Sequence, residues 1–216
     1  MTLALFRDAL AGALSAANVR TNADLIVSAA TVLADRYTEP NRAYHDSTHI
    51  AAMLYGLDAN RASARAAHEI ALAILFHDVV YDPRRSDNEA ASASCAETAM
   101  TSLGFAPQQI ARVAGLIMAT QHGAREPAPD DTDCALLLDL DLAILGSAPD
   151  AYRAYAAAIR REYAHVPDVL YRPGRTHVLK TFLAQPNIYR TPKFRARYEV
   201  QARANLAAEV TVLGDA

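Results

Sequence analysis

The stretch "AILFHDVVYDP", residues 73–83, decides how the rest of the chain is arranged. Its first four residues are apolar, and they run directly into His77 and Asp78, two neighbouring ionisable side chains. Burying such groups is costly unless a partner compensates for the lost hydration. The stretch therefore predicts a central helix whose end meets a buried polar partner, and that partner must come from elsewhere in the chain.

Hydrophobic spacing is helical almost everywhere around this stretch, and no segment keeps the two-residue alternation that is typical of a half-buried strand. Residues 66–81 are apolar on nearly all sides, as in a helix enclosed by other helices. Helix starts are indicated by capping or proline residues, namely Asn22 or Thr21, Pro107, the pair Asp131-Thr132, and Pro149. We therefore predict an all-α fold of about nine or ten helices, compact around a central buried helix.

The composition is that of a soluble globular protein. Of 216 residues, 52% are apolar, and no run is long and hydrophobic enough to span a membrane. Arg7 and Asp8 interrupt the apolar N-terminus, so we expect a first helix there and no export. Cys95 and Cys134 form neither a CxxC motif nor a disulfide framework, which favours the cytoplasm. Without repeats or Gly/Ser linkers, residues 1–216 are predicted to form one domain.

Charge is distributed unevenly along the chain. The net charge of -3 gives no reason to expect a nucleic-acid polymer or a membrane surface as partner. Residues 1–150 hold 10 Lys and Arg against 19 Asp and Glu, whereas residues 151–205 hold 11 against 3. We therefore predict a basic helical extension over about 151–213. Its arginines either form ion pairs on solvated helix faces or contact a phosphate, and Arg160 and Arg175 are the first candidates for that contact.

Two histidines supply the first half of a candidate metal site. In "RAYHDSTHIAAML" (42–54), His45 and His49 are spaced i, i+4, so a helix that begins near Tyr44 would place both rings on one face. His77 and Asp78 supply the second half, since neighbours lie about 100° apart around a helix and can approach one cation. Such mixed nitrogen and oxygen ligands suit a divalent ion, whether Mn, Fe, Co, Ni, Zn or Mg.

A further carboxylate is offered by "CALLLDLDLAILG" (134–146). Asp139 and Asp141 lie about 200° apart around a helix, so both cannot reach the same cation. Asp141 shares its face with the bulkier leucines, and we therefore predict that Asp141 is the buried aspartate. The choice between the two stays open at this point.

Together these stretches resemble the HD superfamily of metal-dependent phosphohydrolases, whose name is the His-Asp pair. The similarity is closest to the bacterial group of predicted metal-dependent HD-superfamily phosphohydrolases, and it is carried by "YHDSTHI", "LFHDVVYDP", "DNEAASA", "LLLDLDLAILG" and "IRREY". The resemblance implies an HD-type all-α fold. It also implies a divalent metal ion held by His49, His77, Asp78 and the distal aspartate, taken as Asp141.

Residues 44–49 are also similar to the Tyr-His-Asn-x-x-His motif of cyclic-nucleotide phosphodiesterases. That similarity implies that His45 protonates the leaving oxygen, so the predicted catalytic residues are His45 and the ligand Asp78. Asp46 replaces the Asn of the motif, and residues 79–83 replace a His-Pro-Gly continuation, so specificity for cyclic nucleotides does not follow. The expected partner is a small-molecule phosphomonoester or phosphodiester, with a nucleotide favoured.

Three further residues have two interpretations each. Asn88 and Glu89 either contact substrate or only form the acidic start of a helix. His122 either lines the site or interacts with the C-terminus of a helix. All three are kept as candidate substrate-binding residues.

Three functions are compatible with such a metal site. The first is hydrolysis of a phosphoester, and the second is a regulatory module that holds metal or nucleotide without turnover. The third is a redox di-iron centre, which the shortage of further His and carboxylate ligands counts against. His45 beside a full ligand set favours hydrolysis, because a purely structural cation needs no proton donor.

Overall fold

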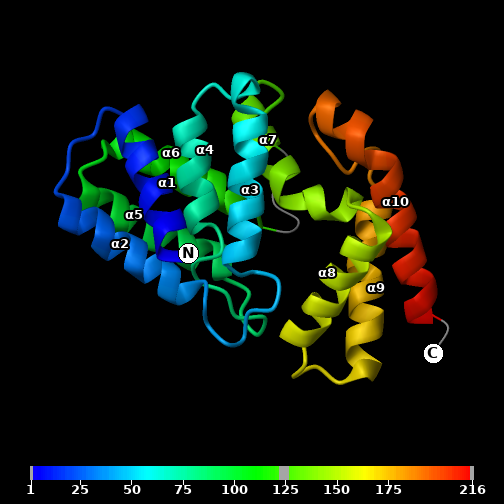
Figure 1. Ribbon diagram of the computed structural model, residues 1–216. Coiled ribbons are helices and arrows are strands. Elements are labelled where there is room, and N and C mark those ends of the chain that lie inside the picture. The colour runs from blue at the N-terminus through cyan, green and yellow to red at the C-terminus, as the bar shows by residue number, and fades with distance from the viewer. Residues whose placement is uncertain (1, 122–126, 215–216) are drawn as a thin grey trace. The chain divides into compact units, whose positions relative to one another are not determined.

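The protein is built from helices in the computed structural model, which describes residues 2–121 and 127–214 (Figure 1). Within these ranges lie ten α-helices and two short 3-10 helices, with no strand. The predicted all-α fold class is confirmed. In the described part of the chain, none of the helices combines the length and the hydrophobicity that crossing a lipid bilayer requires.

The chain divides into two compact units, Met1–Leu137 and Leu138–Ala216. The boundary falls inside one helix, α7, after Leu137, so both aspartates of "LLLDLDLAILG" belong to the second unit. The single domain over residues 1–216, with a basic extension from about 151, stays a prediction.

The first unit contains six complete α-helices, a 3-10 turn and the first part of a seventh helix. They are α1 (Thr2–Ala16), α2 (Ala23–Arg36), α3 (Ser47–Ala59), η1 (Arg61–Ser63), α4 (Ala67–Phe76), α5 (Asn88–Leu103), α6 (Pro107–Ala119) and α7 (Thr132–Asp141). The predicted helix starts of α2 and α6 are confirmed, because Asn22 accepts a hydrogen bond from the Asp24 N–H and Pro107 opens α6.

Helix α4 is the centre of the first unit. It packs against α1, α3, α5 and α6, and its ribbon lies between those of α1 and α3 in Figure 1. Ile70 and residues 72–76 are all buried. The predicted central helix is therefore confirmed, although it ends at Phe76 and His77 is its C-cap.

A buried aspartate from α7 completes the start of α4. The α4 N-cap, Ala66, has no side chain that could cap the helix. Asp133, only 5% exposed, accepts hydrogen bonds from the backbone N–H groups of Arg65 and Ala66, each at 2.8 Å. The carboxylate thus satisfies N–H groups that the helix leaves unpaired at its N-terminus. This contact ties the central helix to α7.

An ion pair connects the middle of α6 to the start of α7. The Asp131 carboxylate accepts from the Cys134 N–H at 3.0 Å, which makes it the cap predicted from the sequence. The Arg112 guanidinium donates to both oxygens of Asp131, at 2.8 and 2.6 Å. The hydrogen bonds from Arg112 hold the pKa of Asp131 below its ordinary value.

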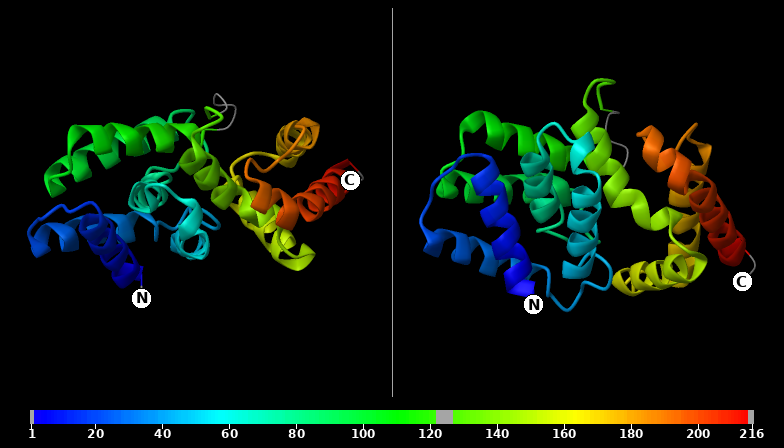
Figure 2. Two further views of the ribbon diagram at one scale, coloured as in Figure 1. Left: turned by 90° about the horizontal axis from the view of Figure 1, so that it is seen from above. Right: turned by 45° about the horizontal axis from the view of Figure 1, so that its top comes forward.

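The second unit is formed by the end of α7 and four further helices. They are η2 (Leu142–Gly146), α8 (Pro149–Glu162), α9 (Asp168–Ala184) and α10 (Pro192–Gly214). Helix α10 packs along α9 and against η2, as the two further views in Figure 2 also show.

Glycine is required where η2 meets α10. A Cβ atom at Gly146 would lie 2.6 Å from the Cβ atom and 2.8 Å from the carbonyl oxygen of Tyr198. The buried Asn205 then donates hydrogen bonds to the carbonyls of Leu145 and Ser147, at 2.8 and 2.9 Å. Close backbone approach and these paired carbonyls together lock the turn after Asp141 onto α10.

Replacing Arg112 by Met should lower the free energy of unfolding more at neutral pH than in acid. Because Arg112 lowers the folded-state pKa of Asp131, the contribution of the pair is complete above the ordinary Asp value of about 3.9. It is lost as the pH falls through the lowered folded-state pKa. Urea unfolding at pH 7 and near pH 3 gives the difference in free energy of unfolding between wild type and Arg112→Met. A difference that is larger near pH 3 than at pH 7 would contradict the stabilising role of the Arg112–Asp131 pair.

Candidate metal centre

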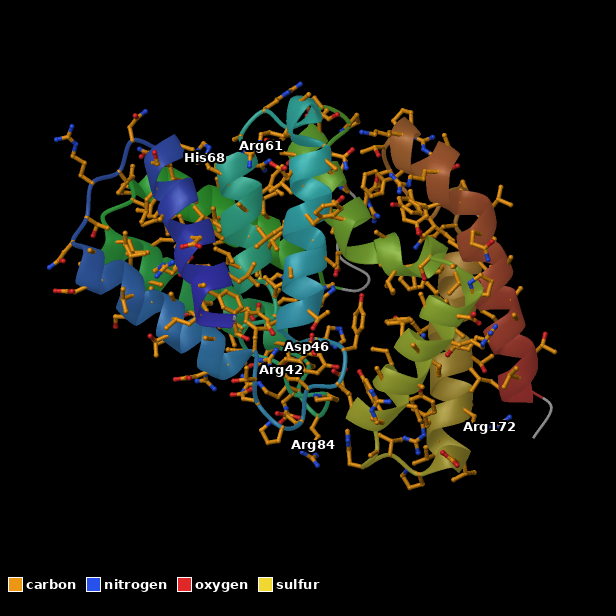
Figure 3. The ribbon with its side chains drawn as sticks, viewed as in Figure 1. Arg42, Asp46, Arg61, His68, Arg84 and Arg172 are labelled. Atoms are coloured by element: carbon orange, nitrogen blue, oxygen red, sulfur yellow. The ribbon has the colours of Figure 1, made fainter. Side chains whose placement is uncertain are left out.

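The start of α3 places His49. The Asp46 carboxylate accepts hydrogen bonds from the N–H groups of Thr48, at 2.7 Å, and of His49, at 3.3 Å, so Asp46 is the N-cap and the helix begins at Ser47. His49 is held in the first turn with its side chain buried. Figure 3 shows Asp46 and Arg42 close together at this end of α3.

The expected helix start near Tyr44 is wrong, because the Asp46 cap begins the helix three residues later. His45 precedes the cap and lies outside the helix, so the i, i+4 argument for one shared helix face does not apply. The two rings are nevertheless neighbours, with 6.0 Å between the ring centroids of His45 and His49. A turn brings them together where a helix face was expected to.

His77 and Asp78 follow the last residue of α4. The His77 N–H donates to the Ala73 carbonyl at 2.8 Å and closes the helix. Its ring Nδ1 lies 2.9 Å from the Ile74 carbonyl oxygen, to which it donates. In the neutral ring this bond puts the lone pair on Nε2, the nitrogen that faces His49.

The separations of the side-chain atoms fit a single cation. The two Nε2 atoms of His49 and His77 are 3.3 Å apart, and His77 Nε2 is 3.1 Å from Asp78 Oδ2. Ligand atoms about 2.1 Å from one ion lie about 3.0 to 3.4 Å from each other at angles of about 90° to 109°. The candidate ligand atoms of all three residues lie within 4.8 Å of one another.

Burial adds to the case for a cation at this cluster. His77 is 2% exposed and His49 is 5% exposed, while the Asp78 side chain is 17% exposed. Two imidazoles and a carboxylate in such surroundings are the mixed N and O donors that divalent transition metals bind. A bound dication would offset the desolvation of the carboxylate. The donor set therefore fits the divalent metal ion expected from the sequence.

A buried arginine connects the two halves of the cluster, and sequence reasoning missed it. The Arg42 side chain is 0% exposed and donates to the carbonyls of His45 at 2.9 Å, Asp78 at 2.7 Å and Val79 at 3.1 Å. It also pairs with Glu39 at 3.2 Å. The sequence offered one sign of its role, its position three residues before His45. Closeness to a motif does not distinguish a buried arginine from an exposed one.

Tyr81 was also missed. Its ring stacks on His45 with 4.2 Å between ring centroids and 30° between ring planes. Tyr44 lies beside His49, at a centroid distance of 4.9 Å. The loop after the His-Asp pair therefore reaches back to the candidate proton donor and limits the orientations of its ring.

The start of α5 holds the loop that follows the His-Asp pair. The Asn88 side chain accepts from the Asp82 N–H at 3.1 Å and donates to the Asp82 carbonyl at 2.9 Å. The Ser92 hydroxyl does the same for Val80, at 3.1 and 3.2 Å. These contacts explain the "DNEAASA" motif as loop support. A substrate role for Asn88, or for the half-buried Glu89, stays a prediction.

Asp139, and not Asp141, is the buried aspartate of the pair. Asp139 is 0% exposed and its two oxygens accept from the N–H groups of Arg190 and Thr191, each at 2.7 Å. Asp141 is half-buried. The predicted order of burial is wrong, because the bulk of neighbouring leucines gives no sign of a backbone turn that needs a cap. Burial raises the pKa of Asp139, and the N–H bonds oppose that shift.

The role of Asp141 as distal ligand stays a prediction, and it no longer rests on the burial of Asp141. Both oxygens of Asp139 already accept backbone hydrogen bonds within the second unit. Asp141 lies near enough to Tyr155 to affect its pKa, so its carboxylate belongs to a partly buried polar environment.

The two candidate arginines of the basic region form ion pairs. Arg160 donates to Asp168 at 2.7 Å and to the carbonyls of Tyr163 and Val166, closing the turn between α8 and α9. Arg175 pairs with Glu209 at 2.8 Å. These contacts agree with the ion-pair interpretation. Phosphate contact by either arginine stays a prediction, and His122 lies outside the described residues.

The chain matches no model of a known protein family, no curated protein and no solved structure. The resemblance to HD phosphohydrolases is therefore carried by the sequence motifs. The geometry of His49, His77 and Asp78 supports the metal centre independently of that resemblance.

His77→Ala should abolish tight metal binding, because it removes the imidazole that lies within 3.3 Å of both other ligand atoms. Metal content after dialysis against Mn²⁺ or Co²⁺ measures this. His68→Ala is the matched control, since His68 lies at the opposite end of α4, as labelled in Figure 3. Equal metal content in His77→Ala and His68→Ala would show that this cluster is not a metal site.

Asp139→Asn should destabilise the protein by about 1–3 kcal/mol without loss of metal, because the amide cannot accept from both the Arg190 and the Thr191 N–H. Asp141→Asn should lower metal content with a smaller effect on stability. Urea unfolding and elemental analysis of both variants separate the two roles. Metal loss in Asp139→Asn, with full content in Asp141→Asn, would make Asp139 the ligand.

Proposed function

We propose that this protein is a metal-dependent phosphohydrolase that cleaves a small-molecule phosphomonoester or phosphodiester, with a nucleotide as the expected substrate. The observation that carries the proposal is the buried cluster of His49, His77 and Asp78, whose ligand atoms are spaced as around one divalent ion. The HD-type motifs agree with it.

The residues of the cluster hold and orient the cation. When bound, a divalent ion supplies an activated water and a positive charge beside the phosphoryl group. The hydrogen bond from His77 Nδ1 to the Ile74 carbonyl keeps Nε2 directed at the ion position. Asp78 contributes the negative charge that such an ion requires, and Asp141 is the predicted distal ligand.

His45 is the proposed general acid. Its ring is half-buried, lies beside the ligand His49 and is held by stacking on Tyr81. A histidine in this position can deliver a proton to the oxygen of the departing alcohol. This role, which a purely structural cation would not need, favours hydrolysis over a module that only holds metal or nucleotide.

One experiment tests the proposal. Elemental analysis of the purified protein identifies the bound ion, and a panel of phosphatase and phosphodiesterase substrates is then assayed with Mn²⁺, Co²⁺, Ni²⁺ and Mg²⁺. The expected result is a bound divalent ion and metal-dependent release of phosphate or alcohol. A protein with its metal site filled that is inactive on every ester would instead be a regulatory module.

His45→Ala should reduce hydrolysis of a natural nucleotide ester by about 10²- to 10⁴-fold while the metal content stays unchanged. An aryl ester such as p-nitrophenyl phosphate should be affected far less, because its phenolate leaves without protonation. Parallel assays on the two substrates, with elemental analysis, make the comparison. Equal losses on both would show that His45 positions substrate or metal and is not the proton donor.

A further inference from the structure

We propose that Arg42 is a positioning residue that sets the distance between the two ligand-bearing segments of the metal centre. The first segment, residues 44–49, carries His49, and the second, residues 77–79, carries His77 and Asp78. The inference rests on the proposed metal centre and names the side chain that holds its two halves together.

One nitrogen of Arg42 joins the two segments. Nη1 donates to the His45 carbonyl at 2.9 Å and to the Asp78 carbonyl at 2.7 Å. Nη2 donates to the Val79 carbonyl at 3.1 Å. The planar guanidinium presents these donors in a rigid fork, so the three carbonyl oxygens are held in one fixed arrangement.

The guanidinium itself has little freedom to move. Its side chain is fully buried, and Nε pairs with Glu39 at 3.2 Å. The rings of Tyr37 and Tyr81 lie 5.0 and 5.6 Å from its central carbon, in the range of cation–π contacts. A side chain held on several sides can transmit its own position to the segments that it binds.

The bonded carbonyls are close to the ligands along the chain. The Asp78 carbonyl belongs to a ligand residue itself, and the His45 carbonyl directly precedes the Asp46 cap that fixes the start of α3 and therefore His49. Loss of the fork would remove these three hydrogen bonds and free both segments to shift. Mutation of a group that orients metal ligands through hydrogen bonds typically lowers metal affinity by about 10- to 100-fold.

Electrostatics alone predicts the opposite sign. Arg42 is a buried positive charge that donates to the carbonyl of the candidate ligand Asp78, so its removal should strengthen metal binding if charge were all that mattered. If Arg42 positions the ligands, its removal should weaken binding. The direction of the change therefore distinguishes the two effects.

The test compares Mn²⁺ and Co²⁺ affinities, measured by calorimetry, of the full-length wild type, Arg42→Met and Arg42→Lys. Arg42→Met should bind about 10- to 100-fold more weakly. Arg42→Lys keeps the charge but lacks the planar fork, so it should bind more weakly as well. If circular dichroism shows that Arg42→Met does not fold, the metal affinity of Arg42→Lys is compared with that of wild type instead.

Arg112→Met is the matched control, because it also removes an arginine ion pair from the first unit but not from the two ligand segments. It should lose stability without a change in metal affinity. Unchanged or tighter binding in a folded Arg42 variant would overturn this inference while the metal centre stands. A wild type that binds no divalent ion would overturn the proposed function and the inference together.

Discussion

Burial of an ionisable pair at the end of an apolar helix is the constraint on which the first unit depends. Helix α4 lies among four other helices, and the transfer of His77 from water to its end is unfavourable unless its ring nitrogens find partners. One nitrogen meets the Ile74 carbonyl and the other faces His49 and Asp78. His49, which the Asp46 cap holds in the first turn of α3, is one of the two partners of this second nitrogen.

Four aspartates among the 19 acidic residues of the first 150 positions bind backbone groups. Asp46, Asp131, Asp133 and Asp139 each accept hydrogen bonds from N–H groups at a helix start or turn. Arg42 and the side chains at the start of α5 do the reverse and satisfy carbonyl groups in the loops around His49, His77 and Asp78. The candidate site is therefore embedded in paired backbone, which gives the three candidate ligand residues the rigidity that a metal site requires.

The sequence by itself determined the features that depend on local pattern. Helical spacing and the absence of strand alternation predicted the all-α class, and the continuous apolar run predicted a buried central helix. Asn22 and Pro149 marked helix starts correctly, since capping depends on neighbours only a few residues away. The pairing of His49 with His77 was also predictable, because two buried polar motifs in one apolar chain have few other partners.

Only the tertiary structure decided the contacts between segments distant in sequence. Asp139 is buried because it caps a turn 51 residues further along the chain, which no pattern of neighbouring leucines reveals. Arg42 is buried because carbonyls 36 and 37 residues away turn toward it. The physical reason is common to both: a side chain pairs with whichever unpaired backbone group packing brings to it, and backbone groups leave no mark in the sequence.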